Sequence, residues 1–361
     1  KIMTNWITEV QDNDYVSKRA SGIIANQMAA DSIEAVGFRK LHYPRMYSAK
    51  LREVGKEARW EYLEALLSSV LPGDTVIVQY PLWTNNTEFE LEFINYLKNV
   101  RHAKIVAMVW DIVSWLQDNR ERDYTKDASL WMLNKYDLVI AANPKMGKRL
   151  REEGGVTTPM IPMHLTDFIY NGPLIPKQYK KELYYVATGI DPAMIEEVPS
   201  DLRINFIGPN NQVKDFPDHV SLLGPMESND IPSKLDGGFG LLYYPQKGGY
   251  KGMHRYGEYN NPMKLSLYLA SGLPVVCLSN TAHAKWIKAQ GVGVVIDNLE
   301  DLGEAINGVS EDAYYQMLDN LKPWQRAVTS GFFAKGAAIE AVRVLNLGFT
   351  DTLIHQEGNN D

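Results

Sequence analysis

The sequence predicts an α/β protein built from two doubly wound domains. Three observations lead to this prediction: the length, an alternation of strand and helix patterns, and a proline-containing break near the middle. At 361 residues the chain is long enough for two domains. Strands that alternate with helices are typical of stacked βαβ units. Ligands bind such folds at the carboxyl ends of the strands, so we expect a ligand in a central cleft that the two domains face.

The first half of the chain alternates between the two patterns up to about residue 153. Residues 75–79 form a continuous apolar run, as expected for a parallel strand covered on both faces. Residues 21–35 carry apolar side chains at helical spacing, and Gly37 follows where the helix should end. Further strands are predicted at 1–7, 104–109 and 138–142, and a polar loop at 8–18. Further helices are predicted at 57–70, 88–97, 130–136 and 144–153.

A linker is predicted at residues 161–181, where Pro162, Gly172, Pro173 and Pro176 interrupt the alternation. The alternation then restarts. Strands are predicted at 182–186, 202–207, 240–243, 275–277 and 292–296. Helices are predicted at 261–269, 281–289, 299–306, 311–321 and 334–345. Residues 348–361 form a polar tail that we expect to be frayed.

The composition is that of an ordinary globular protein, with 45% hydrophobic and 22% charged residues. The 37 basic and 44 acidic residues give a net charge of −7, which argues against a protein held on nucleic acid by its overall charge. Cys277 is the only cysteine, which excludes an intrachain disulfide and favours a reducing compartment. Apolar runs stay below the roughly 18 residues of a membrane helix, and residues 1–10 lack a signal-peptide core, so we expect a cytoplasmic protein.

The most informative stretch is residues 254–276, HRYGEYNNPMKLSLYLASGLPVV. Asn261 and Pro262 predict the start of a helix, with Asn261 as the cap and Pro262 in the first helical position. Lys264 then falls in the first turn, where a positive charge opposes the helix dipole. An anion bound at this helix end would explain the lysine, because free amides and the ammonium would converge on it. The alternative is a solvated surface lysine.

The order Asn-Pro-x-Lys, helix, Ala-Ser-Gly-Leu-Pro-Val-Val resembles the nucleotide-sugar motif of GT-B glycosyltransferases. Three further segments, residues 79–89, 237–241 and 331–333, occur in matching order. Together they resemble the glucosyltransferase 3 family, which extends O-linked GlcNAc on bacterial serine-rich-repeat adhesins. The block Lys-Leu-Ser-Leu-Tyr-Leu-Ala-Ser-Gly is also similar to bacterial galactofuranosyltransferases. The resemblance spans about residues 20 to 345.

The resemblance implies a GT-B fold with an N-terminal acceptor domain at 1–170 and a C-terminal nucleotide-sugar domain at 171–330. It also implies that a helix within 331–347 crosses back to the first domain, ahead of the tail. The implied donor is a UDP-sugar, and the implied acceptor is a glycosylated Ser/Thr-rich protein. The family further suggests a homo-oligomer.

The same resemblance implies which residues bind the donor. Lys264 would hold the diphosphate, and Ser21 takes the place of a family threonine that faces it. A family arginine has no counterpart in the loop at 189–193; Arg255 is a candidate substitute because it is near the motif, and a solvated loop arginine is the alternative. The other residues expected at the nucleotide sugar are Asn205, Phe206, Ile207, Tyr259, Asn260 and Asn261.

Three residues are candidates for the acceptor side. Asp111 directly follows a predicted strand, so its carboxylate should lie at the strand's carboxyl end and serve as general base or orient the acceptor sugar. A helix or turn cap is the alternative reading of Asp111. Trp83 and Trp115 lie beside polar loops and could stack on acceptor sugars, with hydrophobic packing as the alternative.

A few other motifs of the sequence bear on metal and cofactor binding. Asp12-Asn13-Asp14 spells the D-x-D that binds a metal in GT-A enzymes, but nothing else is GT-A-like, so we expect no metal and no cofactor. The glycine-rich loop that starts at Asp236 is followed by a strand pattern instead of a helix, which argues against a dinucleotide site. His164 lies near the predicted linker and could contact either ligand, but a structural role is favoured, and Cys277 is expected to belong to the core.

The sequence therefore predicts a metal-independent glycosyltransferase that moves a hexose or GlcNAc, with glucose favoured, from a UDP-sugar to GlcNAc-modified Ser/Thr of an adhesin. Neither a nucleic-acid partner nor a membrane segment is expected. One alternative is a galactofuranosyltransferase of polysaccharide synthesis. The other is a non-catalytic glycopeptide-binding chaperone subunit on a GT-B scaffold, because a fold does not determine function.

Overall fold

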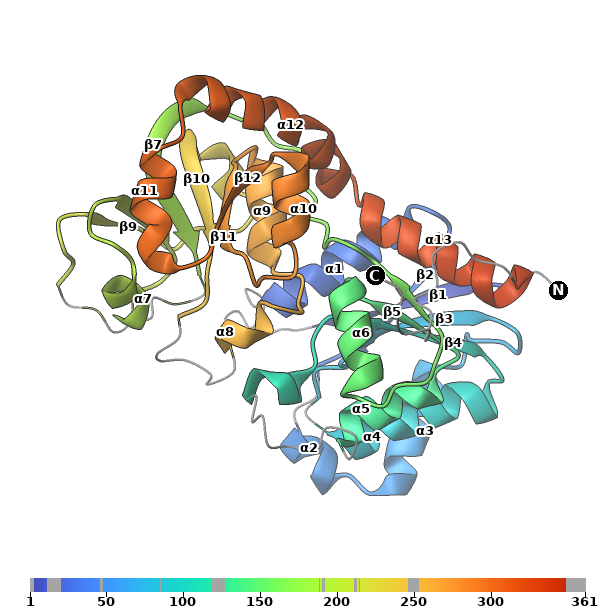
Figure 1. Cartoon of the computed structure of the whole chain (residues 1–361). Helices are drawn as coiled ribbons and strands as arrows, with labels where there is room; N and C mark the ends of the chain where they lie inside the picture. The colour runs from blue at the N-terminus through green and yellow to red at the C-terminus, as the bar shows by residue number, and fades with distance from the viewer. Residues whose placement is uncertain are drawn as a thin grey trace. The chain divides into compact units, whose positions relative to one another are not determined.

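The chain divides into two compact units, which are described one at a time. The computed structural model describes residues 3–11, 21–45, 48–84, 86–117, 127–187, 189, 192–210, 213, 215–245 and 253–348. Unit 1 consists of Lys1–Ser114, Arg120–Leu165 and Gly331–Asp361. Unit 2 consists of Trp115–Asn119 and Thr166–Ser330. Figure 1 colours both units by position in the chain.

Unit 1 contains a six-stranded sheet in the order β2-β1-β3-β4-β5-β6, and every neighbouring pair is parallel. The strands are β1 (Asn5–Gln11), β2 (Arg39–Pro44), β3 (Thr75–Tyr80), β4 (Lys104–Val109), β5 (Leu138–Ala141) and β6 (Met160–Pro162). All six residues of β3 are buried, as the apolar run predicts. Because the strands are parallel, their carboxyl ends lie along one edge of the sheet.

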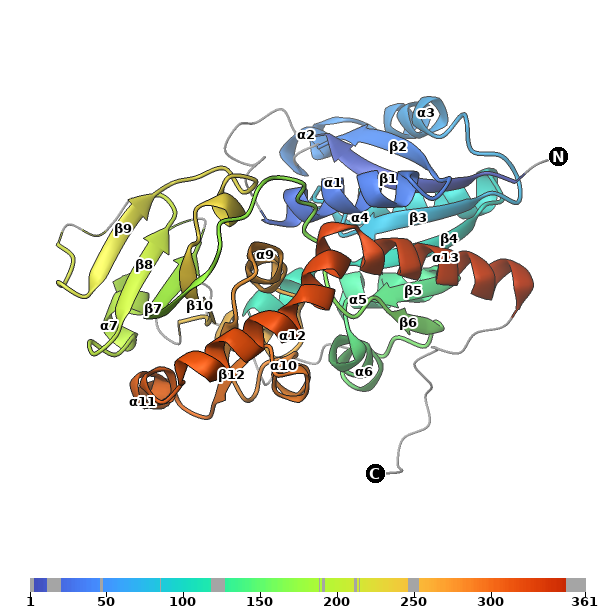
Figure 2. The same cartoon turned by 90° about the horizontal axis from the view of Figure 1, so that it is seen from above.

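Helices cover both faces of this sheet, with α1 and α13 on one face and α3 to α5 on the other (Figures 1 and 2). The helices of unit 1 are α1 (Ser21–Glu34), α2 (Ser48–Glu53), α3 (Lys56–Leu66), α4 (Thr87–Asn95), α5 (Ala128–Met132), α6 (Pro144–Glu152) and α13 (Phe332–Leu347). The last of these, α13, packs against α1, β5 and β6. The Lys104 ammonium at the start of β4 donates to Leu345 O and Asn346 Oδ1, at 2.9 and 2.7 Å, which fixes the end of α13.

Unit 2 contains a second six-stranded parallel sheet, in the order β12-β11-β10-β7-β8-β9. Its strands are β7 (Gln178–Val186), β8 (Arg203–Ile207), β9 (Val220–Gly224), β10 (Gly237–Leu242), β11 (Val275–Leu278) and β12 (Gly293–Ile296). Its helices are α7 (Pro192–Glu197), α8 (Met253–Tyr256), α9 (Met263–Ser271), α10 (Ala284–Gln290), α11 (Leu302–Asn307) and α12 (Glu311–Thr329). The two sheets confirm the predicted α/β architecture.

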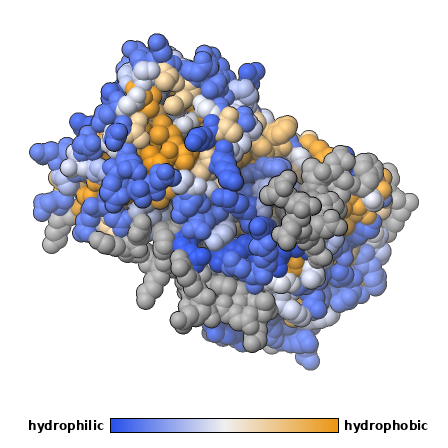
Figure 3. Space-filling view, viewed as in Figure 1, coloured by the Kyte–Doolittle hydropathy of each residue, from blue (hydrophilic) through white to orange (hydrophobic). Residues whose placement is uncertain are grey.

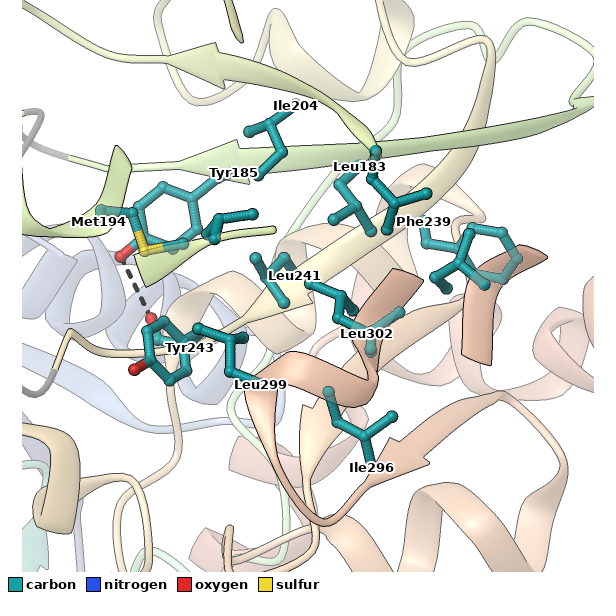
Figure 4. Close-up of a cluster of buried hydrophobic side chains, with 14 of the residues drawn as sticks. Leu183, Tyr185, Met194, Ile204, Phe239, Leu241, Tyr243, Ile296, Leu299 and Leu302 are labelled. Atoms are coloured by element: carbon teal, nitrogen blue, oxygen red, sulfur yellow. Dashed lines mark hydrogen bonds between the residues drawn. The ribbon is translucent and has the colours of Figure 1, made fainter. Parts of the chain in front are cut away.

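The core of unit 2 lies between the sheet and the helices α7 and α11 (Figure 4). Leu183 of β7, Leu241 of β10 and Leu302 of α11 are completely buried there. Tyr185 also belongs to this cluster, and its hydroxyl donates to the Tyr243 carbonyl at 3.1 Å (Figure 4). That bond joins the carboxyl ends of β7 and β10, which lie side by side in the sheet.

The glycine-rich segment after Asp236 is a strand and not the expected loop. Gly237 begins β10, and a Cβ atom there would come within 2.1 Å of the Gln178 carbonyl oxygen of β7. A Cβ on Gly240 would come within 2.2 Å of the Tyr268 ring on α9. The glycines thus permit close strand and helix packing, and they do not serve a nucleotide loop.

Several element boundaries differ from the prediction, mainly where strands carry polar residues. Residues 8–11 belong to β1, although they were predicted to be loop, because Thr8 and Glu9 find partners inside the structure. Thr8 Oγ1 accepts from the backbone N–H of Gln79 at 2.8 Å, and the Glu9 carboxylate lies 3.3 Å from the Lys40 ammonium. The edge strands β2 and β9 were not predicted, and the predicted linker overlaps both β6 and the start of β7. Edge strands are commonly polar, which weakens their sequence pattern.

The visible face of the molecule is mainly hydrophilic, with separate hydrophobic patches (Figure 3). Among the described residues, the most exposed large hydrophobic side chains are Leu347, Phe332 and Met3, at 67%, 62% and 57%. Within that same part of the chain, no helix has the length and apolarity that crossing a membrane requires.

Candidate functional site

The amino-terminal end of α9 (Met263–Ser271) carries Lys264, the residue expected to hold the diphosphate. Lys264 is the second residue of α9, and the first turn of this helix contains no acidic side chain. Gly272, with φ 71°, ends the helix in the left-handed conformation, as the sequence predicts for this glycine. Lys264 is therefore a basic group at the end of a helix where the dipole favours a negative one.

The ammonium of Lys264 lies among tyrosine rings. Its nitrogen is 4.0 Å from the ring centroid of Tyr185 and 5.1 Å from that of Tyr244. Burial lowers the pKa of Lys264 from 10.5 to about 8, and Tyr244 opposes the shift. No carboxylate among the described residues contributes to that pKa. Lys264 is half-buried, so the site holds a partly desolvated positive charge whose natural complement is an anion.

The start of α9 differs from the prediction in one detail. Pro262 is the residue that precedes the helix, in the capping position predicted for Asn261. The Asn261 Oδ1 lies 2.8 Å from Nε2 of His283. This bond ties the segment before α9 to the start of α10.

A small pocket of about 60 Å³ opens beside this segment in unit 2. Its lining residues include Tyr244, Pro262, Thr281 and His283. Asn260, which is 7% exposed, lies 3.4 Å from the Tyr244 hydroxyl through its Nδ2. Its Oδ1 is buried and has no hydrogen-bond partner within the described part of the chain. Lys264, Asn260 and the pocket thus share one neighbour, Tyr244.

The predicted residues at the end of β8 are largely buried. Phe206 is 1% exposed and packs edge-on against Tyr185 at 5.5 Å between ring centroids. Asn205 and Ile207 are 6% and 2% exposed. Phe206 belongs to the hydrophobic core cluster. A ligand at this strand end would therefore contact the backbone more readily than these buried side chains.

Arg255, Tyr259 and Trp115 also lie in unit 2. Arg255 is in α8 and is half-buried, as is Tyr259 just after that helix. Trp115 is completely buried, and its ring lies 6.1 Å from the ring of Tyr259. The burial of Trp115 fits the packing alternative and removes the exposed face that stacking on an acceptor sugar requires.

In unit 1, Asp111 lies two residues beyond the carboxyl end of β4 and is half-buried. A buried polar network organises this edge of the sheet. Gln79 of β3 donates from Nε2 to the carbonyls of Thr8 and Asn26, at 2.6 and 3.0 Å, and its Oε1 accepts from Trp110 Nε1 at 2.9 Å. The network therefore joins β1, β3 and α1 to the residue before Asp111.

The indole of Trp83 lies at the amino-terminal end of α1, over Gly22, the residue after Ser21. Ser21 is the first residue of α1 and is exposed. The indole of Trp83 covers the next residue, because a Cβ on Gly22 would come within 2.5 Å of Trp83 Cζ2. Trp83 has a left-handed backbone with φ 57°, which costs roughly 1–3 kcal/mol in a non-glycine residue. The loop that carries Trp83 must therefore be held by its surroundings.

The remaining candidates concern metal and dinucleotide binding. Asp12-Asn13-Asp14 and the family-arginine loop, apart from Gly189, Pro192 and Ala193, lie outside the described residues. Among the residues that are described, no group of three or more His, Cys, Asp or Glu could hold a metal ion. Cys277 is buried in β11, and His164 follows β6 with φ 77°.

Sequence reasoning missed Tyr185, Tyr244 and Glu90, which shape these two regions. Tyr185 and Tyr244 belong to apolar strand ends, where a tyrosine is ordinarily a core residue. Glu90 had a detectable signal: it shares a helix face with Ile94 and Leu97, at the spacing i, i+4, i+7. A carboxylate on an apolar helix face calls for a specific partner.

Comparisons with known proteins cover both units. Residues 4–165 match the family model described as "Glucosyltransferase 3-like, N-terminal domain", and residues 183–341 match the corresponding C-terminal domain. The chain is 25% identical to Glucosyltransferase 3 of Streptococcus gordonii over 335 residues, which are 91% of this chain and 96% of that protein. It is 24% identical to Glucosyltransferase 3 of Streptococcus parasanguinis over 341 residues, 94% of this chain and 98% of that protein.

Two more distant similarities complete the comparison. A β-1,6-galactofuranosyltransferase of Escherichia coli is 26% identical over 87 residues, 24% of this chain and 26% of that protein. The solved structure of sucrose-phosphate synthase from Thermosynechococcus elongatus has a TM-score of 0.60 at 12% identity, covering 95% of this chain and 98% of that one. At that identity the likeness shows the fold, which is GT-B.

Proposed function

We propose a donor, an acceptor and a set of binding residues for this chain, which belongs to the glucosyltransferase 3-like family. It is a UDP-sugar-dependent glycosyltransferase. The donor sugar is glucose, and the acceptor is GlcNAc on Ser or Thr of a serine-rich-repeat adhesin. The names of the two streptococcal relatives support glucose as the transferred sugar.

The observation that carries this proposal is the environment of Lys264. Its side chain is half-buried, its ammonium lies over two tyrosine rings, and no carboxylate within the described residues contributes to its pKa. The donor's diphosphate supplies the missing negative charge, next to the free amides at the start of α9. When the sugar leaves, charge grows on the diphosphate, and Lys264 together with the helix end stabilises it.

The donor's other contacts lie around Tyr244. Asn260 offers a buried Oδ1 that lacks a partner among the described residues, and it suits a hydroxyl or imide donor of the nucleotide sugar. Asn261 is held in place by His283. Arg255 and Tyr259 belong to the same segment and remain candidates for the phosphates and the sugar.

Unit 1 carries the proposed acceptor residues. Asp111 takes the proton from the acceptor hydroxyl or orients the acceptor sugar. Trp83 offers a partly exposed indole beside Ser21, at the start of α1. The burial of Trp115 leaves Trp83 as the better candidate for stacking on a sugar face.

We propose that transfer needs no metal, because Lys264 and the start of α9 supply the charge neutralisation that a cation provides in other transferases. Activity is therefore expected to persist in excess EDTA, at the rate seen with added Mg²⁺ or Mn²⁺. Release of UDP, measured with and without the chelator, checks this. Loss of turnover in EDTA with recovery in Mn²⁺ would support a metal role for Asp12 and Asp14 and contradict the proposal.

The choice of donor and acceptor is tested by UDP release from UDP-glucose, UDP-GlcNAc and UDP-galactofuranose, each with and without a GlcNAc-modified Ser/Thr peptide. We expect the fastest release with UDP-glucose and the peptide together. Preference for UDP-galactofuranose would identify the polysaccharide alternative. Binding of UDP and peptide without turnover would identify a binding subunit on a transferase scaffold.

A further inference from the structure

Glu90 is a buried carboxylate that the proposed reaction does not use. It lies in the first turn of α4 and is 6% exposed. The pKa of Glu90 rises from 4.5 to about 7 because of burial, although hydrogen bonds from Thr84 and Leu82 oppose the rise. No basic side chain among the described residues contributes to it. An ionisable group kept in such a place has a structural or functional reason.

The hydrogen bonds of Glu90 bracket Trp83. Thr84 Oγ1 donates to Glu90 Oε1 at 3.0 Å, and the backbone amide of Leu82 also donates to the carboxylate. Trp83, between these two residues, has the left-handed backbone described above. Two bonds to one carboxylate, on either side of a strained residue, hold that residue in its conformation.

The strained conformation has a visible consequence. It places the Trp83 indole over Gly22, beside the exposed Ser21. Trp83 is partly exposed, and its Nε1 is enclosed without a hydrogen-bond acceptor among the described residues. Within the described part of the chain, the indole is therefore held by packing and by its loop.

We propose that Glu90 is a positioning residue: its carboxylate holds the loop from Leu82 to Thr84, and so keeps the Trp83 indole at the start of α1 as a platform for the acceptor sugar. The acceptor part of this statement rests on the proposed function. The positioning part rests on the contacts of unit 1 alone. Glu90 acts through Trp83 and does not touch the reacting atoms.

Protonation weakens this support. The bonds from Thr84 and Leu82 are charge-assisted when Glu90 is ionised, and neutral bonds are roughly half as strong. Because the pKa is about 7, the carboxylate is mostly ionised at pH 8 and mostly neutral at pH 6. The groups that face Glu90 are Tyr43 of β2, Tyr80 of β3 and Tyr136; burial raises the pKa of each well above 10, and the charge of Glu90 raises it further. These tyrosines stay neutral through that range.

The test is fluorine NMR of the protein labelled with 5-fluorotryptophan, in which Trp83→Phe identifies the Trp83 signal among the 8 tryptophans. The Trp83 signal should titrate with a midpoint of about 7. In Glu90→Gln it should be displaced and independent of pH. Thr84→Val removes one bond to the ionised form, so the midpoint should rise above 7.

Glu88→Gln is the matched control. Glu88 lies in the same turn of α4, but its side chain is 69% exposed and pairs with Arg59 at 2.9 Å. The Trp83 titration should survive in that variant. A Trp83 signal that titrates in Glu90→Gln as it does in the parent protein, or that ignores Thr84→Val, would overturn the positioning role.

Transfer at pH 8 tests the link to the acceptor. Glu90→Gln should raise the KM for the GlcNAc-modified peptide by about threefold to tenfold and leave UDP affinity unchanged. An unchanged KM together with a displaced Trp83 signal would overturn the acceptor part. If the parent protein bound no UDP, the proposed function would be contradicted, and the fluorine signals would still decide the positioning role.

Discussion

Replacing Lys264 by alanine is expected to weaken UDP binding by about 10-fold to 150-fold, as measured by titration calorimetry. This range corresponds to the roughly 1.5–3 kcal/mol of a hydrogen bond to a charged group. The reason is that the Lys264 ammonium lies half-buried at the start of α9 with no acidic residue in that turn, and a bound diphosphate would be its main electrostatic partner.

The control for this prediction is Lys285→Ala. Lys285 is the second residue of α10, as Lys264 is of α9, but it is exposed. Its removal should leave UDP affinity unchanged. Neither variant should lower the melting temperature of the ligand-free protein. Burying a charge is unfavourable, so the Lys264 ammonium contributes little to the stability of the protein without its ligand. Equal UDP affinity in Lys264→Ala and the parent protein would refute the assignment.

The pKa of Lys264 gives the same prediction a pH dependence. A pKa lowered to about 8 means that the ammonium loses its proton as the pH rises through 8. An anion binds the protonated form better, so UDP affinity should be highest below pH 8 and should fall toward pH 9. In Lys264→Ala this decline should disappear. A decline of the same size in both proteins would mean that another group is responsible.

Replacing Asp111 by asparagine is expected to lower transfer to the glycosylated peptide by about 10²–10⁴-fold, the typical contribution of a general base. Asparagine keeps the shape of the side chain but cannot accept the proton of the acceptor hydroxyl. UDP affinity should stay normal, because Asp111 follows β4 of unit 1 and the proposed diphosphate ligand is Lys264 of unit 2. The rate of single-turnover transfer, measured beside UDP binding, separates the two effects.

Asp137→Asn controls for disturbance of the sheet. Asp137 accepts from the amide of Ile105 at 2.8 Å, near the amino end of β4, and pairs with Lys98 at 2.7 Å. This variant should lower stability and leave transfer nearly unchanged. A loss below about tenfold in Asp111→Asn would mean that Asp111 orients or caps and is not the base. Parallel loss of UDP binding and transfer would contradict its assignment to the acceptor.

The parts of the fold that sequence predicts well are those in which local pattern and burial agree. The buried run of β3 and the helix from Met263 to Gly272 are examples, and the family resemblance itself follows from such segments. Residues 8–11 of β1 were misjudged, because the partners of Thr8 and Glu9 come from β3 and β2, far along the chain. The helix predicted at 311–321 also ends too early, because α12 continues past Pro323 to Thr329. Its later part contacts a distant helix: Gln325 donates to the Ala270 carbonyl of α9 at 2.9 Å.

The candidate site shows the same division. Lys264 was proposed because its charge conflicts with its position in a helix and because the segment around it resembles the GT-B motif, and both are local properties. The pairing of Asn261 with His283 and the bracketing of Trp83 by Glu90 depend on tertiary contacts, which no spacing in the sequence displays. Trp115 was expected beside an acceptor because polar residues surround it in sequence, yet tertiary packing against Tyr259 buries it.

The most direct test of the central claim is the mass of a GlcNAc-modified Ser/Thr peptide after incubation with this protein and UDP-glucose. We expect the peptide to gain one hexose, UDP to be released in equal amount, and Lys264→Ala to slow the gain at limiting UDP-glucose. A peptide of unchanged mass, in a sample that demonstrably binds UDP-glucose and releases no UDP, would contradict that claim.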